Sequence, residues 1–429
     1  MGIKEFIKIL DGKGLLVRIK KEVSTKYETS TLMKLLDGKP IFFENVKGHK
    51  MPIIANLCSN REFVALGLGI NKNELIEKLT KAIDQPKEPK IVESKDYKEI
   101  EPDLNKLPIL TYYPFDGGPY IASGIVIARD KELGLNASYH RMMVIERDKV
   151  VLRILERHFD VFLKRGNNEF AVCIGCSMPV LLASAVSVEL GKSELSIANA
   201  LSETNLIELD GHKVPEAEII FIAEMTGELH DEGPFLDLTE TPDIVRKQRV
   251  ARIKKIFLAK DPIFHALLPG GLEHKVLMGM PREPTIFREV NKVCKCKDVL
   301  VTPGGCSWLH GAISIEKKNP DDGRKAIEAA FRGHNSMKHV FVVDDDINIH
   351  DPNEIEWALA TRFQGDKDLI IKVKEKGSSL DPSSDLETRE TTKLGFDLTI
   401  PLDKKGKGFK RPELPMKLRI EDYLGFEKK

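Results

Sequence analysis

The chain has 429 residues, which is enough for two or three domains with sizeable cores. Lys and Arg together number 66, as do Asp and Glu, so the net charge is zero and no nucleic-acid partner is indicated. Neither a secretory leader nor an apolar run of membrane-spanning length is recognisable, so we expect a soluble, cytoplasmic protein without a membrane partner.

The first part of the chain is predicted to form a small α/β domain. Residues 1–35 have the pattern of a helix, a short strand and a second helix, and PIFFENV and MPIIANL are typical of strands. NKNELIEKLTKAI predicts an amphipathic helix with Asn71 as its cap. The segment 85–110 is rich in Pro, Lys and Glu and lacks periodicity, so we assign it as a linker and place the first domain at 1–105.

Short β runs dominate residues 106–300. ASGIVIARD, ASYHRMMVIERD, KVVLRILER, NEFAVCIG and LIELDGHKVPEAEIIFIAEMTG are separated by turn residues, which is typical of a barrel-like sheet. Helices are expected at 178–187 and 193–201, with Ser193 as the cap of the second. The basic stretch TPDIVRKQRVARIKKIFLAK, residues 241–260, is predicted to be a helix with a solvated charged face.

Strand and helix patterns alternate over residues 301–429. The apolar runs VLVTPGG, KHVFVVDDDIN and DLIIKV are separated by DDGRKAIEAAFRG and PNEIEWALATRF, so a mostly parallel sheet is expected. Beyond residue 377 the chain is polar and predicted to be irregular, apart from a short helix at RIEDYLGF. The fold class is therefore predicted as α/β (α+β).

Six cysteines in a chain of this length do not indicate a disulfide framework. Two close pairs, Cys173 with Cys176 and Cys294 with Cys296, supply enough thiolates for one zinc ion. The first pair lies in the apolar run FAVCIGCSMPVLLA, where cysteine commonly serves as a small apolar side chain. A zinc-stabilised scaffold is therefore the alternative, and buried free thiols are favoured.

Two carboxylates, Glu232 and Asp237, stand five residues apart on either side of a Gly-Pro bend. A strand directs residues at this spacing to opposite faces, whereas a turn can bring both into one cavity. Paired carboxylates in a closed pocket shift each other's pKa apart, so that one can hold a proton while the other is ionised. An acidic surface turn is the alternative.

Asn136, His158 and Glu194 together form an oxygen and nitrogen donor set that suits Mn²⁺ or Mg²⁺ better than a thiolate site would. Taken singly, each residue also has a structural explanation. Asn136 fits a turn, His158 fits a core or surface imidazole, and Glu194 fits a first-turn acid that stabilises a helix dipole. The spacing alone leaves both interpretations open.

Several motifs in a fixed order reveal a family resemblance. N-x-S-x-x-R at 136–141, a His about 22 residues after Asn136, S-E-x-x-x-A-x-A at 193–200 and E-G-P-F-x-D at 232–237 resemble the UbiD family of decarboxylases. The match continues through PIFHALLPGGLEHKVLMGMPRE, KHVFVVDDDIN, WALATRF and TKLGFDLTIPL. It extends from about Pro108 to Pro401, and the motifs are specific because they occur together.

The resemblance implies three domains and a flavin cofactor. A central domain, 106–300, would resemble a flavin-reductase split β-barrel, and the C-terminal α/β domain would occupy 301–429. The implied cofactor is prenylated FMN, held with Mn²⁺ or another divalent cation and with K⁺ near its phosphate. A flavin prenyltransferase would supply the cofactor, and a homo-oligomer is expected.

The resemblance also assigns roles to particular residues. The metal-ligand positions fall on Asn136, His158 and Glu194, and the monovalent site falls near Ala183 and Ser184. The catalytic positions fall on Arg141, Glu232 and Asp237, with Asp237 where some members have a second Glu. The cofactor-contacting positions fall on Tyr139, His140, Arg141, Arg153, Ile154, Leu155, Arg157, Ser184 and Lys338.

The implied reaction is non-oxidative decarboxylation of an α,β-unsaturated acid, in which Arg141 holds the carboxylate or orients Glu232. Asp237 would deliver the proton that replaces CO₂. The whole chain most resembles compact archaeal members that convert trans-anhydromevalonate 5-phosphate to isopentenyl phosphate, and an aromatic 4-hydroxybenzoate-type decarboxylase of quinone biosynthesis is the alternative. A cofactor-binding or maturation protein without turnover is a third possibility.

A phosphorylated substrate would need a second cationic site, for which His140, Lys275 and Arg282 are the sequence candidates. The acidic triplet Asp344-Asp345-Asp346 has the composition of a metal cluster. Because it lies at the end of a predicted parallel strand, we expect it to have a structural capping role.

Overall fold

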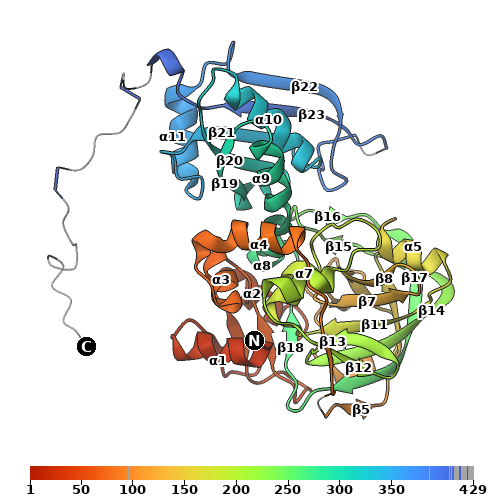
Figure 1. Ribbon diagram of the computed structural model, residues 1–429. Helices are drawn as coiled ribbons and strands as arrows, with labels where there is room; N and C mark the ends of the chain where they lie inside the picture. Colours follow the sequence, from red (N-terminus) through yellow and green to blue (C-terminus); the bar gives the residue numbers. More distant parts are fainter. Residues whose placement is uncertain are drawn as a thin grey trace.

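The computed structural model describes residues 1–404 except Lys95 and Leu386, and beyond them residues 406, 408, 409, 415, 416 and 423. The helix predicted at RIEDYLGF therefore lies outside the described residues, apart from Tyr423. Figure 1 shows a large body formed by the N-terminal and central segments, with the C-terminal sheet and its helices above it. No helix in the described part of the chain has the length and apolar character needed to cross a membrane.

The N-terminal segment forms the helix-strand-helix order expected from its sequence. Its helix α3 was not predicted, although Asn60 caps it by accepting a hydrogen bond from the Phe63 N–H, and Gly69 ends it in the left-handed conformation. The strands form a four-stranded sheet in the order β1-β2-β3-β18, whose last strand comes from the central segment. The elements are α1 (Ile3–Gly12), β1 (Val17–Ile19), α2 (Glu28–Leu35), β2 (Ile41–Phe43), β3 (Ile53–Ala55), α3 (Arg61–Leu68), α4 (Leu75–Asp84) and β18 (Phe264–Ala266).

A nine-stranded sheet forms the central segment, with the strand order β6-β9-β10-β17-β14-β11-β7-β8 and with β5 paired to β17. Neighbouring strands are antiparallel, and the described strand path is open from β6 to β8. The strands are β5 (Lys98–Ile100), β6 (Tyr120–Ile121), β7 (Ile125–Asp130), β8 (Gly134–Tyr139), β9 (Met142–Val144), β10 (Lys149–Leu152), β11 (Glu169–Ile174), β14 (Ile219–Glu232) and β17 (Arg246–Leu258).

The helix predicted for the basic stretch 241–260 is wrong, because this stretch forms strand β17 between β10 and β14. Ile253 is buried between exposed Arg252 and Lys254, which is the two-residue period of a strand. The cationic side chains pair with acids of neighbouring segments, as Lys254 does with Glu169 at 2.6 Å. The lysines and arginines therefore occupy the solvent face of a strand, and they obscured its alternation in the sequence.

The linker 85–110 contributes strands to its neighbours. Its first strand, β4 (Ile91–Val92), joins β12 (Leu206–Leu209) and β13 (His212–Pro215) in a three-stranded sheet, and β5 adds to the central sheet. The helices of the central segment before α9 are α5 (His158–Lys164), which was not predicted, α6 (Met178–Ala183), α7 (Glu194–Leu201) and α8 (Leu272–Gly279). Ser193 caps α7 as expected, by accepting a hydrogen bond from the Leu195 N–H.

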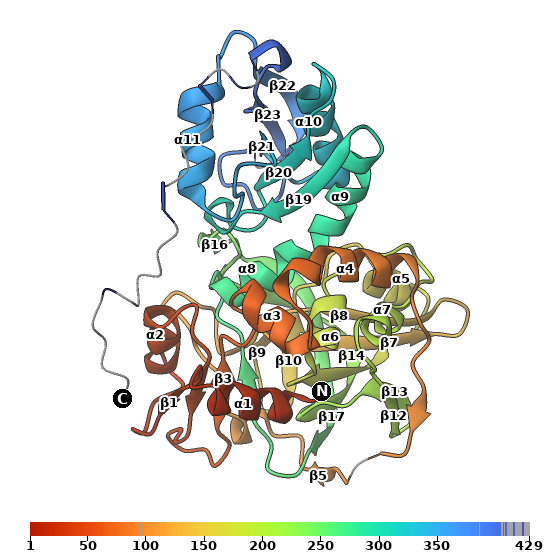
Figure 2. The same cartoon turned by 60° about the vertical axis from the view of Figure 1, so that its left-hand side comes forward.

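The C-terminal sheet has the order β19-β20-β21-β23-β22 and is mixed, whereas a mostly parallel sheet was expected. The pairs β20/β21 and β21/β23 are parallel, and β19/β20 and β22/β23 are antiparallel. Helices cover both of its faces, with α11 on one side and α9 and α10 on the other (Figures 1 and 2). Its elements are α9 (Glu283–Asn291), β19 (Lys295–Val301), β20 (His310–Glu316), α10 (Asp322–Gly333), β21 (His339–Asp344), α11 (Pro352–Arg362), β22 (Leu369–Lys376) and β23 (Glu390–Asp397).

Strand β23 lies in the part beyond residue 377 that was predicted to be irregular, so that prediction is wrong there. Its inward positions include Thr391, Lys393 and Gly395, which are buried but not apolar. Polar residues on the buried face removed the hydrophobic alternation by which a strand is recognised.

The buried core explains the cysteine pairs. Cys173 and Cys176 pack in a cluster with Leu182 and with residues of α1, α3 and α4. Cys296 lies in the separate core of the C-terminal sheet, with Cys294 packed against it. The two pairs therefore belong to different cores, so the four thiolates do not form one zinc site. Because the first cluster joins N-terminal helices to the central sheet, the division at residue 105 stays a prediction.

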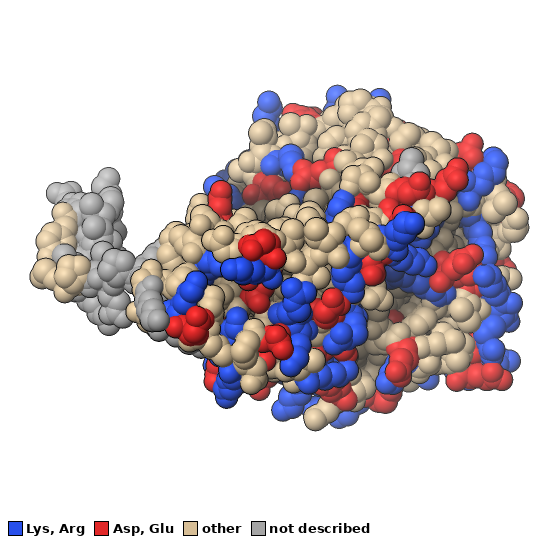
Figure 3. Space-filling view, turned by 90° about the horizontal axis from the view of Figure 1, so that it is seen from above, with Lys and Arg blue, Asp and Glu red and all other residues tan. Residues whose placement is uncertain are grey.

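Acidic and basic side chains are interspersed over the face of the molecule shown in Figure 3, in keeping with the zero net charge.

The acidic triplet Asp344-Asp345-Asp346 has the structural role expected of it. Arg362, whose side chain is fully buried, pairs with Asp344 at 3.4 Å and with Asp346 at 2.7 Å. Asp344 also accepts a hydrogen bond from the Ile400 N–H at 2.7 Å.

Candidate active site

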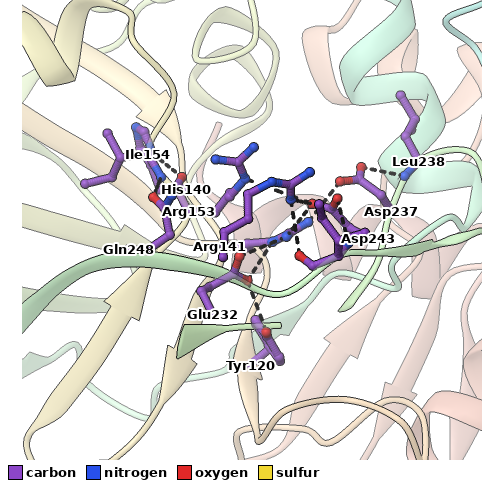
Figure 4. Close-up of polar contacts among 12 residues, drawn as sticks. Tyr120, His140, Arg141, Arg153, Ile154, Glu232, Asp237, Leu238, Asp243 and Gln248 are labelled. Atoms are coloured by element: carbon purple, nitrogen blue, oxygen red, sulfur yellow. Dashed lines mark hydrogen bonds and ion pairs between the residues drawn. The ribbon is translucent and has the colours of Figure 1, made fainter. Parts of the chain in front are cut away.

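Arg141, which follows strand β8, bonds to three carboxylates (Figure 4). Its Nε lies 2.9 Å from Glu232 Oε1, and its Nη2 lies 3.0 Å from Glu232 Oε2. Nη1 donates to Asp237 Oδ2 at 2.9 Å, and Nη2 also donates to Asp243 Oδ2 at 2.8 Å. Burial by itself lowers the pKa of Arg141, but the bonds to these acids raise it overall, so the side chain is a fixed cation.

The Gly-Pro bend brings Glu232 and Asp237 to the same guanidinium, although the two acids do not share one cavity as predicted, because the Glu232 side chain is fully buried. Strand β14 ends at Glu232 and β15 (Phe235–Leu236) begins after the bend, where Gly233 has a φ of +103°. A positive φ of this size favours glycine. The bend therefore turns the chain so that both acids reach Arg141.

The two acids differ in exposure. The Glu232 side chain has an exposed fraction of 0% and accepts a further hydrogen bond from the Tyr120 hydroxyl at 3.0 Å. Burial and the neighbouring Glu232 raise the pKa of Tyr120, so its hydroxyl remains a donor. The Asp237 side chain has an exposed fraction of 21%. Asp237 is therefore the acid of this pair that a bound molecule can reach.

Asp243 is a member of this cluster that the sequence did not reveal. It lies on β16 (Pro242–Asp243), which pairs with β15 so that Phe235 stands opposite Asp243. Arg246 lies 2.6 Å from its carboxylate and Arg153 lies 4.0 Å from it. Burial alone raises the pKa of Asp243, but the bonds from Arg246 and Arg141 hold it below its usual value.

A cavity of about 980 Å³ opens beside this cluster. Its wall contains residues of the central segment and of the C-terminal segment, among them Trp308, Ser378 and Lys393. The predicted site residues that line it are Asn136, Tyr139, His140, Arg141, Arg153, Leu155, Arg157, His158, Ser184, Glu194 and Asp237. Residues from distant parts of the sequence therefore share one cavity.

Three predicted residues have other positions. Glu232 lies behind Arg141 and is sealed from solvent. Ile154 is buried, and its N–H donates to Gln248 Oε1 at 2.9 Å. Lys338 is not among the residues that line the cavity, and its ammonium pairs with Asp381 at 2.9 Å and with the Ser383 hydroxyl.

The cation that the C-terminal segment does place in the cavity wall is Lys393 on β23. It is buried, it donates to the Asn335 carbonyl at 2.5 Å, and burial lowers its pKa. The motif TKLGFDLTIPL contains this lysine. That motif is the sequence signal by which Lys393 could have been found.

The proposed metal ligands lie together. Asn136 Nδ2 donates to Glu194 Oε1 and Oε2, at 3.1 Å each, and the Ala137 N–H donates to Oε2 at 2.9 Å. His158 Nδ1 lies 3.9 Å from Glu194 Oε1. Burial raises the pKa of Glu194 to about 7, and burial followed by the charge of Arg157 lowers the pKa of His158. A divalent cation fits this donor set because it would neutralise a buried carboxylate beside a neutral imidazole and an amide.

Ionisable side chains alone do not reveal this donor set. Among the described residues, no group of three or more His, Cys, Asp or Glu side chains is arranged so that it could hold a metal ion. The set contains two such residues, and Asn136 is the third member.

His140 and Tyr139 have additional hydrogen bonds that hold them in place. His140 Nδ1 lies 3.0 Å from the Arg153 carbonyl oxygen, so Nδ1 carries the proton and donates. Burial lowers the pKa of His140 to about 4, so the ring is neutral. The Tyr139 hydroxyl donates to the Leu181 carbonyl at 3.0 Å.

Family models cover most of the chain. The N-terminal, Rift-related and C-terminal domains described for 3-octaprenyl-4-hydroxybenzoate carboxy-lyase match residues 7–83, 84–272 and 275–398. The anhydromevalonate phosphate decarboxylase of Methanocaldococcus jannaschii is 44% identical over 407 residues, which is 91% of this chain and 96% of that protein. Its counterpart in Methanosarcina mazei is 41% identical over 428 residues, which is 97% of this chain and 100% of that protein.

Solved structures give the same result. The UbiD-class enzyme HmfF from Pelotomaculum thermopropionicum, in complex with FMN, superposes with a TM-score of 0.95 at 36% identity, over 99% of this chain and 100% of that chain. An evolved dimeric form of HmfF in complex with prenylated FMN has a TM-score of 0.89 at 34% identity, over 99% and 100% of the chains.

Proposed function

The chain belongs to the UbiD family of carboxy-lyases, and from this premise we propose that it decarboxylates trans-anhydromevalonate 5-phosphate to isopentenyl phosphate and CO₂. The observation that carries the proposal is the pairing of Arg141 with both Glu232 and Asp237 beside a cavity that has residues of two segments in its wall. The archaeal relatives, which are 35–44% identical over at least nine-tenths of this chain, support the substrate.

The proposed cofactor is prenylated FMN, held together with Mn²⁺ or another divalent cation and with K⁺. Asn136, His158 and Glu194 would hold the divalent cation, and Lys393 would contribute positive charge from the C-terminal segment. The HmfF complexes with FMN and prenylated FMN support this choice. When bound, prenylated FMN supplies an electron sink for the electron pair released by loss of CO₂.

Arg141 positions the substrate in this proposal. It makes four hydrogen bonds to carboxylates among the described residues, which leaves one of its five N–H groups for a substrate carboxylate. Because three acids fix the guanidinium, its orientation is set before the substrate binds. Glu232, which is fully buried and bonded to Tyr120, holds Arg141 from behind.

Asp237 is the proposed proton donor. The bond between the α-carbon and the carboxyl carbon breaks and CO₂ leaves. A C–H bond then forms at the same carbon with a proton that the partly exposed Asp237 takes up from solvent and delivers. The reaction involves no net oxidation. The partial exposure of Asp237 to the cavity supports this role, because a donor must reach the reacting carbon.

Several further assignments complete the proposal. We assign the open antiparallel sheet to the split-barrel type. We also propose a flavin prenyltransferase as the supplier of the cofactor, a homo-oligomeric assembly and a cytoplasmic location.

The experiment that tests this function is an assay of protein co-expressed with a flavin prenyltransferase. Mass spectrometry and visible absorption establish the loaded cofactor, and CO₂ release is then measured with trans-anhydromevalonate 5-phosphate and with 4-hydroxybenzoate. We expect turnover of the phosphorylated acid. Preference for 4-hydroxybenzoate would contradict the substrate, and absence of CO₂ release from either acid by loaded protein would contradict the proposed reaction.

A further inference from the structure

The proposed substrate carries two anionic groups, and the structure distinguishes the cations that could bind the second one. A carboxylate near Arg141 leaves a phosphate at the other end of a short carbon chain. A phosphate dianion gains most from a buried cation that no acid of the protein neutralises, whereas a carboxylate can still bind the one N–H group that Arg141 keeps free. The cationic side chains of the cavity can therefore be sorted by whether they have an acidic partner.

Most of the candidates are already neutralised or neutral. Arg153 and Arg246 face Asp243, at 4.0 Å and 2.6 Å. Lys275 does not line the cavity, and it forms an ion pair with Glu240. His140 is neutral, because burial lowers its pKa to about 4.

Three other cations in the wall, Arg157, Lys376 and Arg389, are exposed, so water already solvates them. Lys393 is buried, and its ammonium donates to the Asn335 carbonyl in the C-terminal wall, where we have placed it with the cofactor. Burial also lowers the pKa of the two other histidines in the wall, His158 and His274, so Arg282 is the remaining candidate.

Arg282 lines the cavity and has no acidic partner among the described residues. Its Nη1 donates to the Ser187 hydroxyl, and its guanidinium lies 5.2 Å from the centre of the Trp308 ring. Its Nε is buried and has no hydrogen-bond acceptor in the described part of the chain. A buried N–H without an acceptor has a free-energy cost that a bound anion would offset.

The electrostatic environment of Arg282 also favours an anion. Burial, followed by the charge of Arg157, lowers the pKa of Arg282 to about 10. The positively charged guanidinium groups of Arg157 and Arg282 therefore repel each other, and no carboxylate in the described part of the chain pairs with either of them. Guanidinium binds phosphate through two parallel N–H···O bonds, so this arrangement suits a phosphate dianion.

The position of Arg282 relates it to the catalytic cluster. Helix α8 (Leu272–Gly279) is followed directly by a short 3₁₀ turn, Met280–Arg282, and α8 lies where the two bodies of the molecule meet (Figures 1 and 2). His274 on α8 lines the same cavity, and the charges of Asp237 and Arg141 act on it. Arg282 follows His274 by eight positions, which corresponds to roughly 12–13 Å along α8 and the 3₁₀ turn.

We propose that Arg282, together with Ser187, binds the phosphate of the substrate and so makes the enzyme selective for the phosphorylated acid. This inference rests on the proposed function. The same chemistry would also suit the phosphate of the flavin, so the experiment must distinguish binding of the substrate phosphate from binding of the flavin phosphate.

The test compares Arg282→Met and Arg282→Lys with wild type, all co-expressed with the flavin prenyltransferase. Arg288→Met is the matched control, because Arg288 lies on the following helix α9 and pairs with Asp84 at the surface. Flavin content is measured by visible absorption. The ratio of kcat/KM for the phosphorylated acid to kcat/KM for its dephosphorylated form is then determined for each protein.

We expect Arg282→Met to retain its flavin and to lower this ratio at least about 30-fold, because the phosphate loses a buried charged partner. Arg282→Lys should lower it less, since lysine keeps the charge but not the two parallel bonds. Arg288→Met should keep the wild-type ratio. An unchanged ratio in both Arg282 variants would overturn the proposal, and loss of flavin from both would assign Arg282 to the cofactor instead.

Binding of inorganic phosphate to the flavin-loaded proteins, measured by calorimetry, separates this inference from the proposed function. Wild type and Arg288→Met should bind phosphate, and Arg282→Met should bind it at least about 30-fold more weakly. If Arg282 is required for phosphate binding but the phosphorylated enoic acid is not turned over, the site stands and the proposed substrate is wrong. If loaded wild type binds no phosphate, the inference is wrong even when the decarboxylation is observed.

Discussion

Two groups of charged side chains in the cavity wall differ in how they are neutralised. Around Arg141, three guanidinium groups meet three carboxylates, those of Glu232, Asp237 and Asp243. Glu194 and Arg282, in contrast, have no oppositely charged protein group within ion-pair distance among the described residues, apart from the weakly basic His158. The charges that the protein neutralises itself form a rigid cluster around Arg141, whereas the charges that it leaves uncompensated lie where we propose that the divalent cation and the substrate phosphate bind.

Substitution of Arg141, which pairs with all three carboxylates, should have a large effect on the stability of the fold. Arg141→Met leaves Glu232, which is fully buried, without its cation. Breaking a buried ion pair from one side costs about 3–5 kcal/mol, so the free energy of unfolding in urea should fall by that amount. Arg288→Met removes only an exposed pair and should change it by less than about 1 kcal/mol. Equal effects of the two substitutions would show that the Arg141 cluster does not stabilise the fold.

The lowered pKa of His140 predicts how the stability of the fold depends on pH. Its pKa falls from 6.5 in the unfolded chain to about 4 in the folded protein, mainly through burial. Because this folded-state pKa is depressed, the stability that the neutral ring contributes is present above pH 6.5 and is lost as the pH falls through about 4. The shift corresponds to about 3 kcal/mol.

The measurement is urea unfolding of wild type and His140→Asn between pH 7 and pH 4. The amide of Asn replaces the Nδ1 donor but does not titrate in this range. Wild type should lose more stability on acidification than the variant. Parallel pH profiles for the two proteins would contradict the assignment of a neutral, buried His140.

Substitution of Glu194, whose charge no strong cation of the protein compensates, should have a smaller effect than that of Arg141, and the effect should appear in ligand binding. Glu194→Gln keeps the size and hydrogen-bonding capacity of the side chain but removes its charge, so affinity for Mn²⁺ should fall at least about 10–100-fold. Metal content is measured by elemental analysis of the purified protein, and flavin content should fall with it. Tyr120→Phe, which also removes a buried polar group but lies in the Arg141 cluster, is the control and should retain its metal. Full metal and flavin in Glu194→Gln would mean that Glu194 is not a ligand.

The sequence predicted the helix-strand order of the N-terminal segment and the proximity of Glu232 and Asp237, because local periodicity and a turn determine both. It did not predict that Glu232 lies behind Arg141 and outside the cavity. It missed β17 and β23, because Lys254 on one strand and Lys393 on the other interrupt the hydrophobic pattern. It also missed Asp243, since its contact with Arg141 depends on the pairing of β15 with β16 and has no local signal.

The cationic residues show the same limitation. Lys338 and Lys393 are both lysines beside C-terminal strands, and only the fold shows that Lys393 lines the cavity while Lys338 pairs with Asp381. Similarly, His140, Lys275 and Arg282 are equivalent candidates for the phosphate site in the sequence, and only their partners in the fold distinguish them. The presence of a charge can be read from a sequence, but its neutralisation depends on tertiary contacts.

Turnover by the Asp237→Asn variant tests the central claim most directly, because the substitution keeps the size of the side chain and removes the proton that it would deliver. The variant is co-expressed with the flavin prenyltransferase, its loaded flavin is quantified, and CO₂ release from trans-anhydromevalonate 5-phosphate is measured per flavin. We predict that kcat falls by roughly 10²–10⁴-fold with flavin content unchanged. Near-normal turnover by the flavin-loaded variant would contradict the claim that the cavity-facing acid of the Arg141 cluster delivers the proton.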